Sequence, residues 1–315
     1  MYRIGVDIGG TKVAGGVLSA AHELLVYRTS PFPGADRPLA SIGAVAGLIE
    51  ELLAETGDSI SGITSIGVAV PGSIDYTNGS VIAAHNLGYH KFPLVKLLQA
   101  QFPGVYIDLE NDANAAALAE FYCGSMQGCH TAVLITLGTG VGGGMIINDK
   151  LFIGGCHNGC EIGHTILVDG GEACTCGNRG CFEAYCSATA IIREGRRAAE
   201  RYPDCLLAIR TRSGEPIDAK LVIDCAKEKD PVALGVFEAF VEHLASAVAS
   251  LINIFDPEVI AIGGGVCKAG DFLFDALNRA VQPKAFFDSF GSIVPAQTGN
   301  EAGVIGAALL AEHRR

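Results

Sequence analysis

The stretch Asp7-Ile8-Gly9-Gly10-Thr11-Lys12 joins two β-branched runs, Arg3–Ile8 and Val13–Leu18, through a pair of glycines. A strand, a tight glycine turn and a second strand form a β-hairpin whose turn amides can point at an anion, whereas a dinucleotide-binding fold would place a helix after the turn. A glycine pair between strands is structural about as often as it binds a ligand. Here Thr11 and Lys12 add donors, and Asp7 is placed to hold Mg²⁺ through water. No Walker A pattern occurs in the sequence.

A second glycine-rich segment lies in mid-chain, at Thr136-Leu137-Gly138-Thr139-Gly140-Val141-Gly142-Gly143-Gly144, again with strand patterns on both sides. One such hairpin in each half predicts a duplicated, two-domain clamp with phosphate between the halves. No long linker is present, so the boundary is expected within Glu120–Gly128. We predict a small α/β domain over 1–122, a larger one over 123–300, and a C-terminal helix over 301–315 that packs back on the first.

Strand and helix patterns alternate along the rest of the chain, which predicts an α/β fold. The remaining strands are expected at Ile63–Val70, Val105–Leu109, Thr131–Leu137, Met145–Asn148 and Val259–Ile262. Apolar residues at helical spacing predict helices over Ala40–Ala54 and Pro231–Phe255.

The composition narrows the class of protein. The chain has 315 residues, of which 49% are hydrophobic, enough to fill the cores of about two domains. It starts without a signal-peptide pattern, and its longest apolar run, Ala245–Phe255, is too short to cross a bilayer. Eleven cysteines without a signal peptide indicate a reducing compartment, so we expect a cytoplasmic protein. A net charge of -12 argues against nucleic acid as a partner.

A polar cluster, Glu110-Asn111-Asp112, follows the strand pattern Val105–Leu109 and opens an alanine-rich helix. One interpretation is that Asn111 or Asp112 merely caps the helix. The other is catalytic, because a carboxylate at a strand-to-helix junction can accept the proton of a substrate hydroxyl that attacks phosphorus. We predict Asp112 as the general base, with Asn111 orienting the acceptor.

Another glycine run, Gly263-Gly264-Gly265, ends the strand pattern near Ile262. A triple glycine alone is weak evidence, but Gly264 and Gly265 would let a flat purine lie against the backbone. The small residues of Glu301–Ala308 are better explained by close helix packing than by a ligand.

Three cysteines and one histidine have the spacing of a closed metal site. They lie in Glu161-Ile162-Gly163-His164 and in Cys174-Thr175-Cys176-Gly177-Asn178-Arg179-Gly180-Cys181-Phe182-Glu183. Three thiolates and one imidazole make a tetrahedral zinc set, so we predict structural Zn²⁺ on His164, Cys174, Cys176 and Cys181. Such a zinc knuckle would fix two nearby carboxylates, Glu161 and Glu183, in position. The other eight cysteines are interpreted as small hydrophobes or bystanders.

Taken together, these segments resemble the ROK family of sugar kinases and repressors, in the actin-like ATPase superfamily with its ribonuclease H-like fold. The resemblance covers nearly the whole chain, and its most specific part is the pattern Cys-x-Cys-Gly-x-x-Gly-Cys-x-Glu with an upstream Glu-x-Gly-His. One departure is Cys160, which precedes Glu161 where the family usually has glycine.

The resemblance implies the roles of individual residues. ATP would be bound at Asp7, Gly9, Gly10, Thr11, Lys12, Gly138, Thr139, Gly140, Gly264 and Gly265. The sugar would be bound at Gly72, Asn111, Asp112, Glu161, His164 and Glu183, with His164 also on zinc.

We therefore predict a glucokinase that moves the γ-phosphoryl group of ATP to the 6-hydroxyl of glucose, with Mg²⁺ and structural Zn²⁺, as a homodimer. Alternative sugars are fructose, allose, mannose, N-acetylglucosamine and N-acetylmannosamine, and polyphosphate is an alternative donor. A sugar-responsive regulator without its DNA-binding domain is a further alternative, disfavoured because the chain starts at its first strand and is acidic. A non-catalytic zinc-stabilised binding module is a third, opposed by Asp112 beside the glycine hairpins.

Overall fold

The computed structural model describes residues 2–57 and 62–314. These residues form two compact units. Unit 1 comprises 1–130, 144–160 and 298–315, and unit 2 comprises 131–143 and 161–297. The predicted domain boundary at residue 123 stays a prediction, because a compact unit need not be a part that folds by itself.

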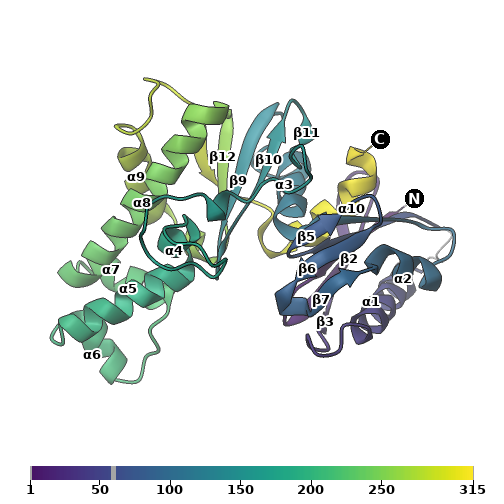
Figure 1. Cartoon of the computed structure of the whole chain (residues 1–315), viewed down its shortest axis with the longest axis horizontal. Coiled ribbons are helices and arrows are strands. Elements are labelled where there is room, and N and C mark those ends of the chain that lie inside the picture. The colour runs from purple at the N-terminus through teal and green to yellow at the C-terminus, as the bar shows by residue number, and fades with distance from the viewer. Residues whose placement is uncertain (1, 58–61, 315) are drawn as a thin grey trace. The chain divides into compact units, whose positions relative to one another are not determined.

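Unit 1 is built on a mixed five-stranded sheet with the strand order β3-β2-β1-β4-β8 (Figure 1). β1 (Tyr2–Ile8) pairs antiparallel with β2 (Lys12–Leu18), which pairs antiparallel with β3 (Leu24–Pro31). β4 (Ile63–Val70) lies parallel to β1 and to β8 (Tyr106–Asn111). The carboxyl ends of β1, β4 and β8 therefore share one edge, which is where ligands bind in sheets of this kind. The helices of unit 1 are α1 (Ala40–Thr56), α2 (Leu94–Gln101), α3 (Asp112–Cys123) and α10 (Ala302–His313).

The C-terminal helix α10 packs against the N-terminal part of the chain, on β1, β4 and α3 (yellow in Figure 1). This approach requires small residues, because a Cβ added to Gly67 of β4 would lie 1.7 Å from the carbonyl oxygen of Ala307. A Cβ on Gly306 would lie 1.6 Å from the carbonyl oxygen of Ala115 in α3. Helix packing thus accounts for the small-residue pattern near the C-terminus.

A small second sheet in unit 1 follows β4 and has the order β5-β6-β7. Its strands are Ser73–Asp75, Ser80–Ala84 and Tyr89–Phe92, with the 3₁₀ helix η2 (His85–Leu87) before the last one. Sequence patterns predicted neither this sheet nor β3, because these strands are short or half-exposed and lack a clear alternation of apolar residues.

Unit 2 contains three neighbouring parallel strands that belong to the second five-stranded sheet, in the order β9-β12-β13. They are β9 (Thr131–Leu137), β12 (Val259–Gly263) and β13 (Ser292–Pro295). β10 (Val141–Ile147) continues into unit 1, where its end pairs with β11 (Lys150–Leu151). It begins four residues earlier than predicted, since its glycines hide the strand pattern.

Most of the helices in the described residues belong to unit 2. They are α4 (Glu183–Cys186), α5 (Ala188–Arg201), α6 (Leu206–Arg212), α7 (Ala219–Lys227), α8 (Pro231–Phe255) and α9 (Asp271–Val281), with short 3₁₀ helices η3 (Ile162–His164) and η4 (Gly265–Ala269). A further 3₁₀ helix, η5 (Gly299–Glu301), precedes α10 in unit 1.

One helix among the described residues, α8, is long and apolar enough to span a membrane by length and composition. The sequence analysis considered only the shorter run Ala245–Phe255 and therefore underestimated the length of this apolar segment. Half of its most apolar window is buried inside the protein, and α8 packs against α5, α7 and α9 (green in Figure 1). The core helix of a compact unit passes the same test of length and composition.

Candidate active site and metal site

The first glycine turn closes the hairpin between β1 and β2, as predicted. The amide of Gly9 donates to the carbonyl of Lys12 at 2.9 Å, and Gly10, Thr11 and Lys12 are exposed. Their donors thus lie at the edge of the sheet where β1, β4 and β8 end. An exposed turn at this edge has the geometry needed to receive an anion.

Asp7 lies at the carboxyl end of β1, beside two groups with opposite effects on its pKa. Burial, and then the neighbouring carboxylate Asp112, raise the pKa of Asp7 to about 6, while Lys12 opposes that shift. α10 contributes to the burial, because a Cβ on Gly303 would lie 2.6 Å from a carboxylate oxygen of Asp7. A carboxyl group with a raised pKa beside a second carboxylate is an electrostatic setting that a bound cation would relieve.

Asn111 and Asp112 stand where β8 ends and α3 begins. The side-chain oxygen of Asn111 accepts the amides of Ala113 and Asn114 at 2.9 and 3.3 Å, so Asn111 is the N-cap of α3. Its amide nitrogen donates to the carbonyl of Gly72 at 3.2 Å. The structural interpretation of Asn111 is therefore correct. Capping is compatible with a role of this junction in catalysis, because the cap fixes Asp112 in the first turn of the helix.

A buried carboxylate behind this junction was missed by the sequence analysis. Glu110 is fully buried and accepts hydrogen bonds from Tyr76 (2.5 Å), the backbone amide of Asn111 (2.8 Å) and Asn114 (3.0 Å). Its other oxygen pairs with Arg314 at 2.8 Å. A charged residue inside a buried strand was the available signal, but its main partner is about 200 residues away in the chain.

The second glycine turn, Gly138–Gly140, connects β9 to β10 in unit 2. The amide of Gly138 donates to the carbonyl of Gly140 at 3.0 Å. Next to it lies the loop after β12, where Gly264 has a φ of 89° and a Cβ would lie 2.3 Å from the carbonyl oxygen of Leu137. The predicted phosphate turn and the predicted adenosine loop, with Gly264 and Gly265, are thus neighbours at the carboxyl ends of parallel strands.

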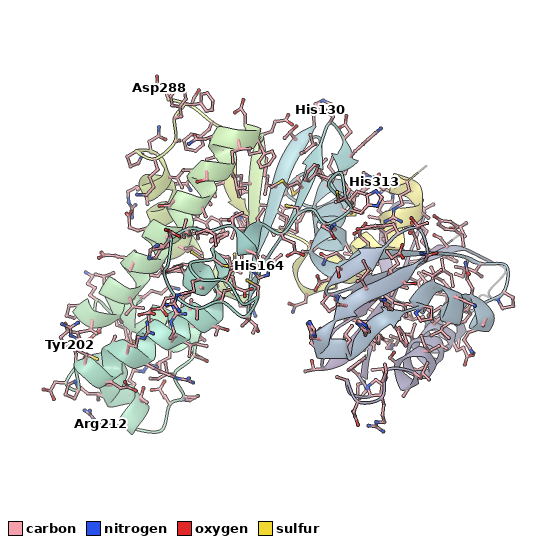
Figure 2. The ribbon with its side chains drawn as sticks, viewed as in Figure 1. His130, His164, Tyr202, Arg212, Asp288 and His313 are labelled. Atoms are coloured by element: carbon pink, nitrogen blue, oxygen red, sulfur yellow. The ribbon has the colours of Figure 1, made fainter. Side chains whose placement is uncertain are left out.

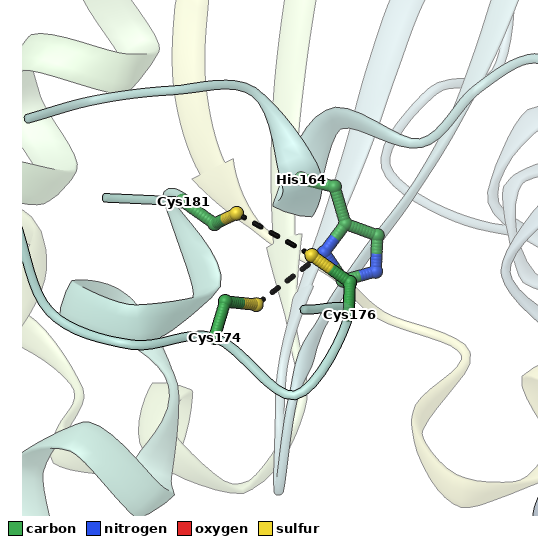
Figure 3. A group of neighbouring side chains, drawn as sticks. All are labelled: His164, Cys174, Cys176 and Cys181. Atoms are coloured by element: carbon green, nitrogen blue, oxygen red, sulfur yellow. Dashed lines mark hydrogen bonds between the residues drawn. The ribbon is translucent and has the colours of Figure 1, made fainter. Parts of the chain in front are cut away.

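The four predicted zinc ligands converge on one point in unit 2 (Figure 3). The donor atoms of His164, Cys174, Cys176 and Cys181 all lie within 4.8 Å of one another. The sulfurs of Cys176 and Cys181 are 3.6 Å apart, close to the ~3.8 Å that tetrahedral Zn–S bonds of about 2.3 Å require. The turn depends on Gly180, which has a φ of 82° and whose Cβ would meet the carbonyl oxygen of Val168. The cluster fits zinc in donor type, number and spacing.

The three thiols of the cluster differ in pKa when no metal is bound. Burial raises the pKa of the Cys181 thiol to about 12 and that of Cys174 above its usual value, while backbone hydrogen bonding at Asn178 lowers the pKa of Cys176. Zinc binding there would release protons, because the metal takes thiolates.

The two ring nitrogens of His164 lie near different groups, and Figure 3 shows the one that faces Cys174. Nδ1 lies 3.7 Å from the sulfur of Cys174, and Nε2 lies 4.0 Å from a carboxylate oxygen of Glu161. The histidine can thus face a metal with one nitrogen while the other meets a carboxylate or a ligand hydroxyl.

The predicted site residues are grouped by unit. Within unit 1 the structure brings together Asp7, the first turn, Gly72, Asn111 and Asp112. Within unit 2 it brings together Glu183, the metal cluster and the second turn, and Glu161 lies beside His164.

Comparisons with known proteins assign the chain to a family. The ROK family matches residues 3–314. A glucokinase from Thermotoga maritima is 37% identical over 99% of this chain and 97% of its own, and an N-acetylmannosamine kinase from Shigella boydii is 32% identical over 99% of both. The crystal structure of a ROK family glucokinase from Streptomyces griseus, in complex with glucose and AMPPNP, superposes with a TM-score of 0.81 at 32% identity, covering 98% of this chain and 99% of that one.

These likenesses extend over nearly the whole length of the chain and of its relatives, and they confirm the predicted two-domain, actin-like α/β fold. The chain therefore belongs to the ROK family and is glucokinase-like over its whole length.

Proposed function

We propose that this ROK family protein is an ATP-dependent glucokinase, which transfers the γ-phosphoryl group of ATP to the 6-hydroxyl of glucose. The observation that carries the proposal is the position of Asp112. It stands at the carboxyl end of a parallel strand, in the first turn of α3, with Asp7 as its electrostatic neighbour. A base at such a junction, beside a carboxylate that a magnesium ion would neutralise, is what phosphoryl transfer to a hydroxyl requires.

In unit 1, Asp112 takes the proton of the attacking hydroxyl and Asn111 holds the sugar beside it. Asp7 would hold Mg²⁺, and the turn amides of Gly9 and Gly10, with Thr11 and Lys12, would bind phosphate oxygens. The support for these roles is the exposure of the turn and its shared edge with Asn111 and Gly72. Charge that develops on the transferred group is thus met by prearranged donors.

In unit 2, the turn Gly138-Thr139-Gly140 contacts phosphate, and Gly264 and Gly265 leave room for adenosine. Glu161, His164 and Glu183 bind sugar hydroxyls. Carboxylates and an imidazole suit a polyol, because a sugar analogue that lacks one hydroxyl leaves a buried polar group unpaired. Zinc bound by the Cys3His cluster would make the segment that carries its ligands rigid. Its four protein ligands would leave no open coordination position, so the metal would take no part in the chemistry.

Glucose is our first choice of sugar, supported by the glucokinases among the relatives. N-acetylmannosamine is the runner-up, because a kinase for that sugar is similar over the same length. Fructose, allose, mannose and N-acetylglucosamine complete the panel to be tested. The departure at Cys160, next to Glu161, falls on the sugar side of the proposed site.

The test is a coupled assay of ADP release across this panel of sugars, with ATP and polyphosphate compared as donors. Wild-type protein is expected to prefer glucose and ATP. Asp112→Ala should lower turnover by at least about a thousandfold, because the base and its charge are both lost. Its melting temperature and zinc content should stay close to those of wild type. Substantial turnover in the variant would refute the role given to Asp112.

A sugar-responsive regulator is the alternative of a different class, and it predicts specific DNA binding without turnover. A gel-shift or anisotropy measurement with the protein's own promoter region separates the two. We further propose that the enzyme is a homodimer and works in the cytoplasm. Light scattering coupled to size exclusion tests the dimer.

A further inference from the structure

The second glycine turn is fastened to the segment that follows the last cysteine of the metal cluster. The amide of Ala188 donates to the carbonyl of Gly138 at 2.8 Å, and the hydroxyl of Thr189 donates to the carbonyl of Thr139 at 2.7 Å. Both donors lie at the start of α5. Two of the three turn residues are therefore held by groups eight or fewer residues beyond Cys181.

Glu183 makes a third connection, from the turn to the interior of the metal loop, as we call the segment 161–186 that carries the four ligands. One carboxylate oxygen accepts the backbone amide of Val141 at 3.0 Å, and the other accepts the hydroxyl of Thr175 at 2.9 Å. Thr175 stands between the ligands Cys174 and Cys176. The carboxylate also lies against the turn itself, because a Cβ on Gly140 would be 2.3 Å from it. A single side chain thus contacts both the metal loop and the glycine turn.

The part of the metal loop around His164 packs on β10, the strand that begins at Val141. A Cβ on Gly163, next to His164, would lie 2.0 Å from the carbonyl oxygen of Val141, and a Cβ on Gly143 would lie 2.3 Å from the side chain of Ile162. Contacts this close leave little freedom for the loop and the strand to move independently. The beginning of β10 is therefore enclosed by both arms of the metal loop.

We propose that the Cys3His loop, acting through Glu183 and Thr189, sets the shape of the glycine turn Gly138–Gly140 and so controls affinity for the phosphates of the nucleotide. This inference rests on the proposed function, because that function assigns phosphate to the turn. Glu183 and Thr189 are positioning residues in this respect. An ordered metal loop holds the turn ready for the phosphates, whereas a loosened loop releases it, and nucleotide binding must then bear the cost of ordering it.

The consequence is that removing the hydroxyl of Thr189, which leaves every proposed sugar ligand in place, should weaken binding of nucleotide more than binding of sugar. The test uses Thr189→Val and Thr175→Val, which remove one hydroxyl each at exposed positions and keep all four ligands. Dissociation constants for Mg·AMPPNP and for glucose are measured by calorimetry, and zinc is counted by mass spectrometry. Both variants should bind Mg·AMPPNP about five- to tenfold more weakly, the effect of one lost hydrogen bond. The Kd for glucose should stay within about twofold of the wild-type value in Thr189→Val.

Amide exchange of the peptide around Val141 gives a readout that needs no ligand. Thr175→Val and zinc-depleted wild type should both exchange faster there, because the variant lacks the hydroxyl that Glu183 accepts and the depleted protein lacks the metal that orders the loop. Thr211→Val is the matched control, since the hydroxyl of Thr211 donates to a backbone carbonyl in α6 at 2.8 Å, away from the turn. It should leave exchange and both affinities unchanged.

The proposal is overturned if both variants keep full zinc and match wild type in Mg·AMPPNP affinity and in exchange around Val141. Equal losses of nucleotide and glucose affinity in Thr189→Val would also overturn it, because they would indicate general disruption. If wild-type protein binds neither Mg·AMPPNP nor glucose, the proposed function fails. The measurement of amide exchange around Val141 would still show whether the metal loop holds the glycine turn.

Discussion

At the scale of single residues, Asp7 and Asp112 show how a site can be built at the expense of stability. Two carboxylates lie near each other at the end of a sheet, and burial and their mutual repulsion raise the pKa of Asp7 to about 6. An ionised Asp7 is therefore less favourable in the folded protein than in the unfolded chain. Groups that serve a ligand often stay in such positions, because the ligand supplies the missing charge.

We predict that Asp7→Asn raises the free energy of unfolding at pH 8 when no Mg²⁺ is bound. The same substitution should lower kinase activity. The folded pKa of about 6 lies above the ordinary value of 3.8, so the penalty is full above pH 6 and disappears as the pH falls towards 4. A shift of this size corresponds to about 3 kcal/mol in the free energy of unfolding. Urea denaturation at pH 8 and pH 4 measures it, and the gain should be present only at pH 8.

A matched control for this variant is Asp75→Asn. Asp75 is half-buried, and hydrogen bonds from Asn78 hold the pKa of its carboxyl below the ordinary value. The same chemical change should therefore bring no gain in stability at pH 8. A loss of stability in Asp7→Asn at pH 8 would show that the carboxylate is favourable where it stands.

The residues that sequence reasoning could find are those whose chemistry is local. The spacing of Cys174, Cys176 and Cys181 predicted a metal cluster that the structure brings together. The bond between Glu183 and Val141 was out of reach, because it joins residues 42 positions apart and depends on tertiary packing. Glu183 was predicted as a sugar ligand for its place in a motif, and that role stays a prediction.

At the scale of elements, the end of α10 closes unit 1 behind the proposed catalytic junction. Arg314, directly after α10, pairs with Glu110 and Asp108 of β8 and lies over the ring of Tyr76 at 5.2 Å. His313 accepts the amide of Leu151 at 2.8 Å (Figure 2). The last helix thus fixes the strand that carries Asn111.

We predict that Arg314→Ala destabilises the protein by about 3 kcal/mol, because it leaves the fully buried Glu110 without its cation. Chemical denaturation measures the loss. Turnover should also fall, since Glu110 accepts the amide of Asn111. Glu110→Gln in the Arg314→Ala background should recover part of the stability, because it removes the unpaired charge.

The control for Arg314 is Arg28→Ala. Arg28 pairs with Glu55 at 2.6 Å, but both side chains are more than a third exposed. Removing an exposed pair typically costs less than about 1 kcal/mol. Equal losses in the two variants would mean that the pair with Glu110 is no stronger than a surface contact.

The elements themselves were predictable to different degrees. The buried strands and the long helices α1 and α8 show strong patterns, and the structure has them close to the predicted bounds. The sheet β5-β6-β7 has strands of three to five residues, too short for a period to emerge. Helices α5 to α7 were not predicted, although α5 has well-separated polar and apolar faces.

At the scale of the whole molecule, each unit repeats one arrangement. Parallel strands end at a common edge, and a glycine turn between two strands stands at that edge. Unit 1 adds Asp112 and Asn111, and unit 2 adds the metal loop. The duplicated hairpins in the sequence predicted this repetition, since a glycine turn between two strand patterns is a local signal. Because of these additions, unit 1 contains the proposed base and unit 2 contains the proposed zinc site.

This division of roles yields a prediction for metal removal. Chelation should speed amide exchange across 161–186 and lower the melting temperature of the protein, because zinc binding contributes directly to the stability of the loop that it orders. β1 and β8 should keep their protection, since unit 1 has its own core and contains none of the four ligands. Exchange mass spectrometry resolves the two units in one experiment. Cys176→Ser should reproduce the effect, and Cys156→Ser, which changes an exposed thiol in unit 1, should not. Protein that has lost its metal yet keeps native exchange in 161–186 and native glucose affinity would show that the cluster does not support the fold.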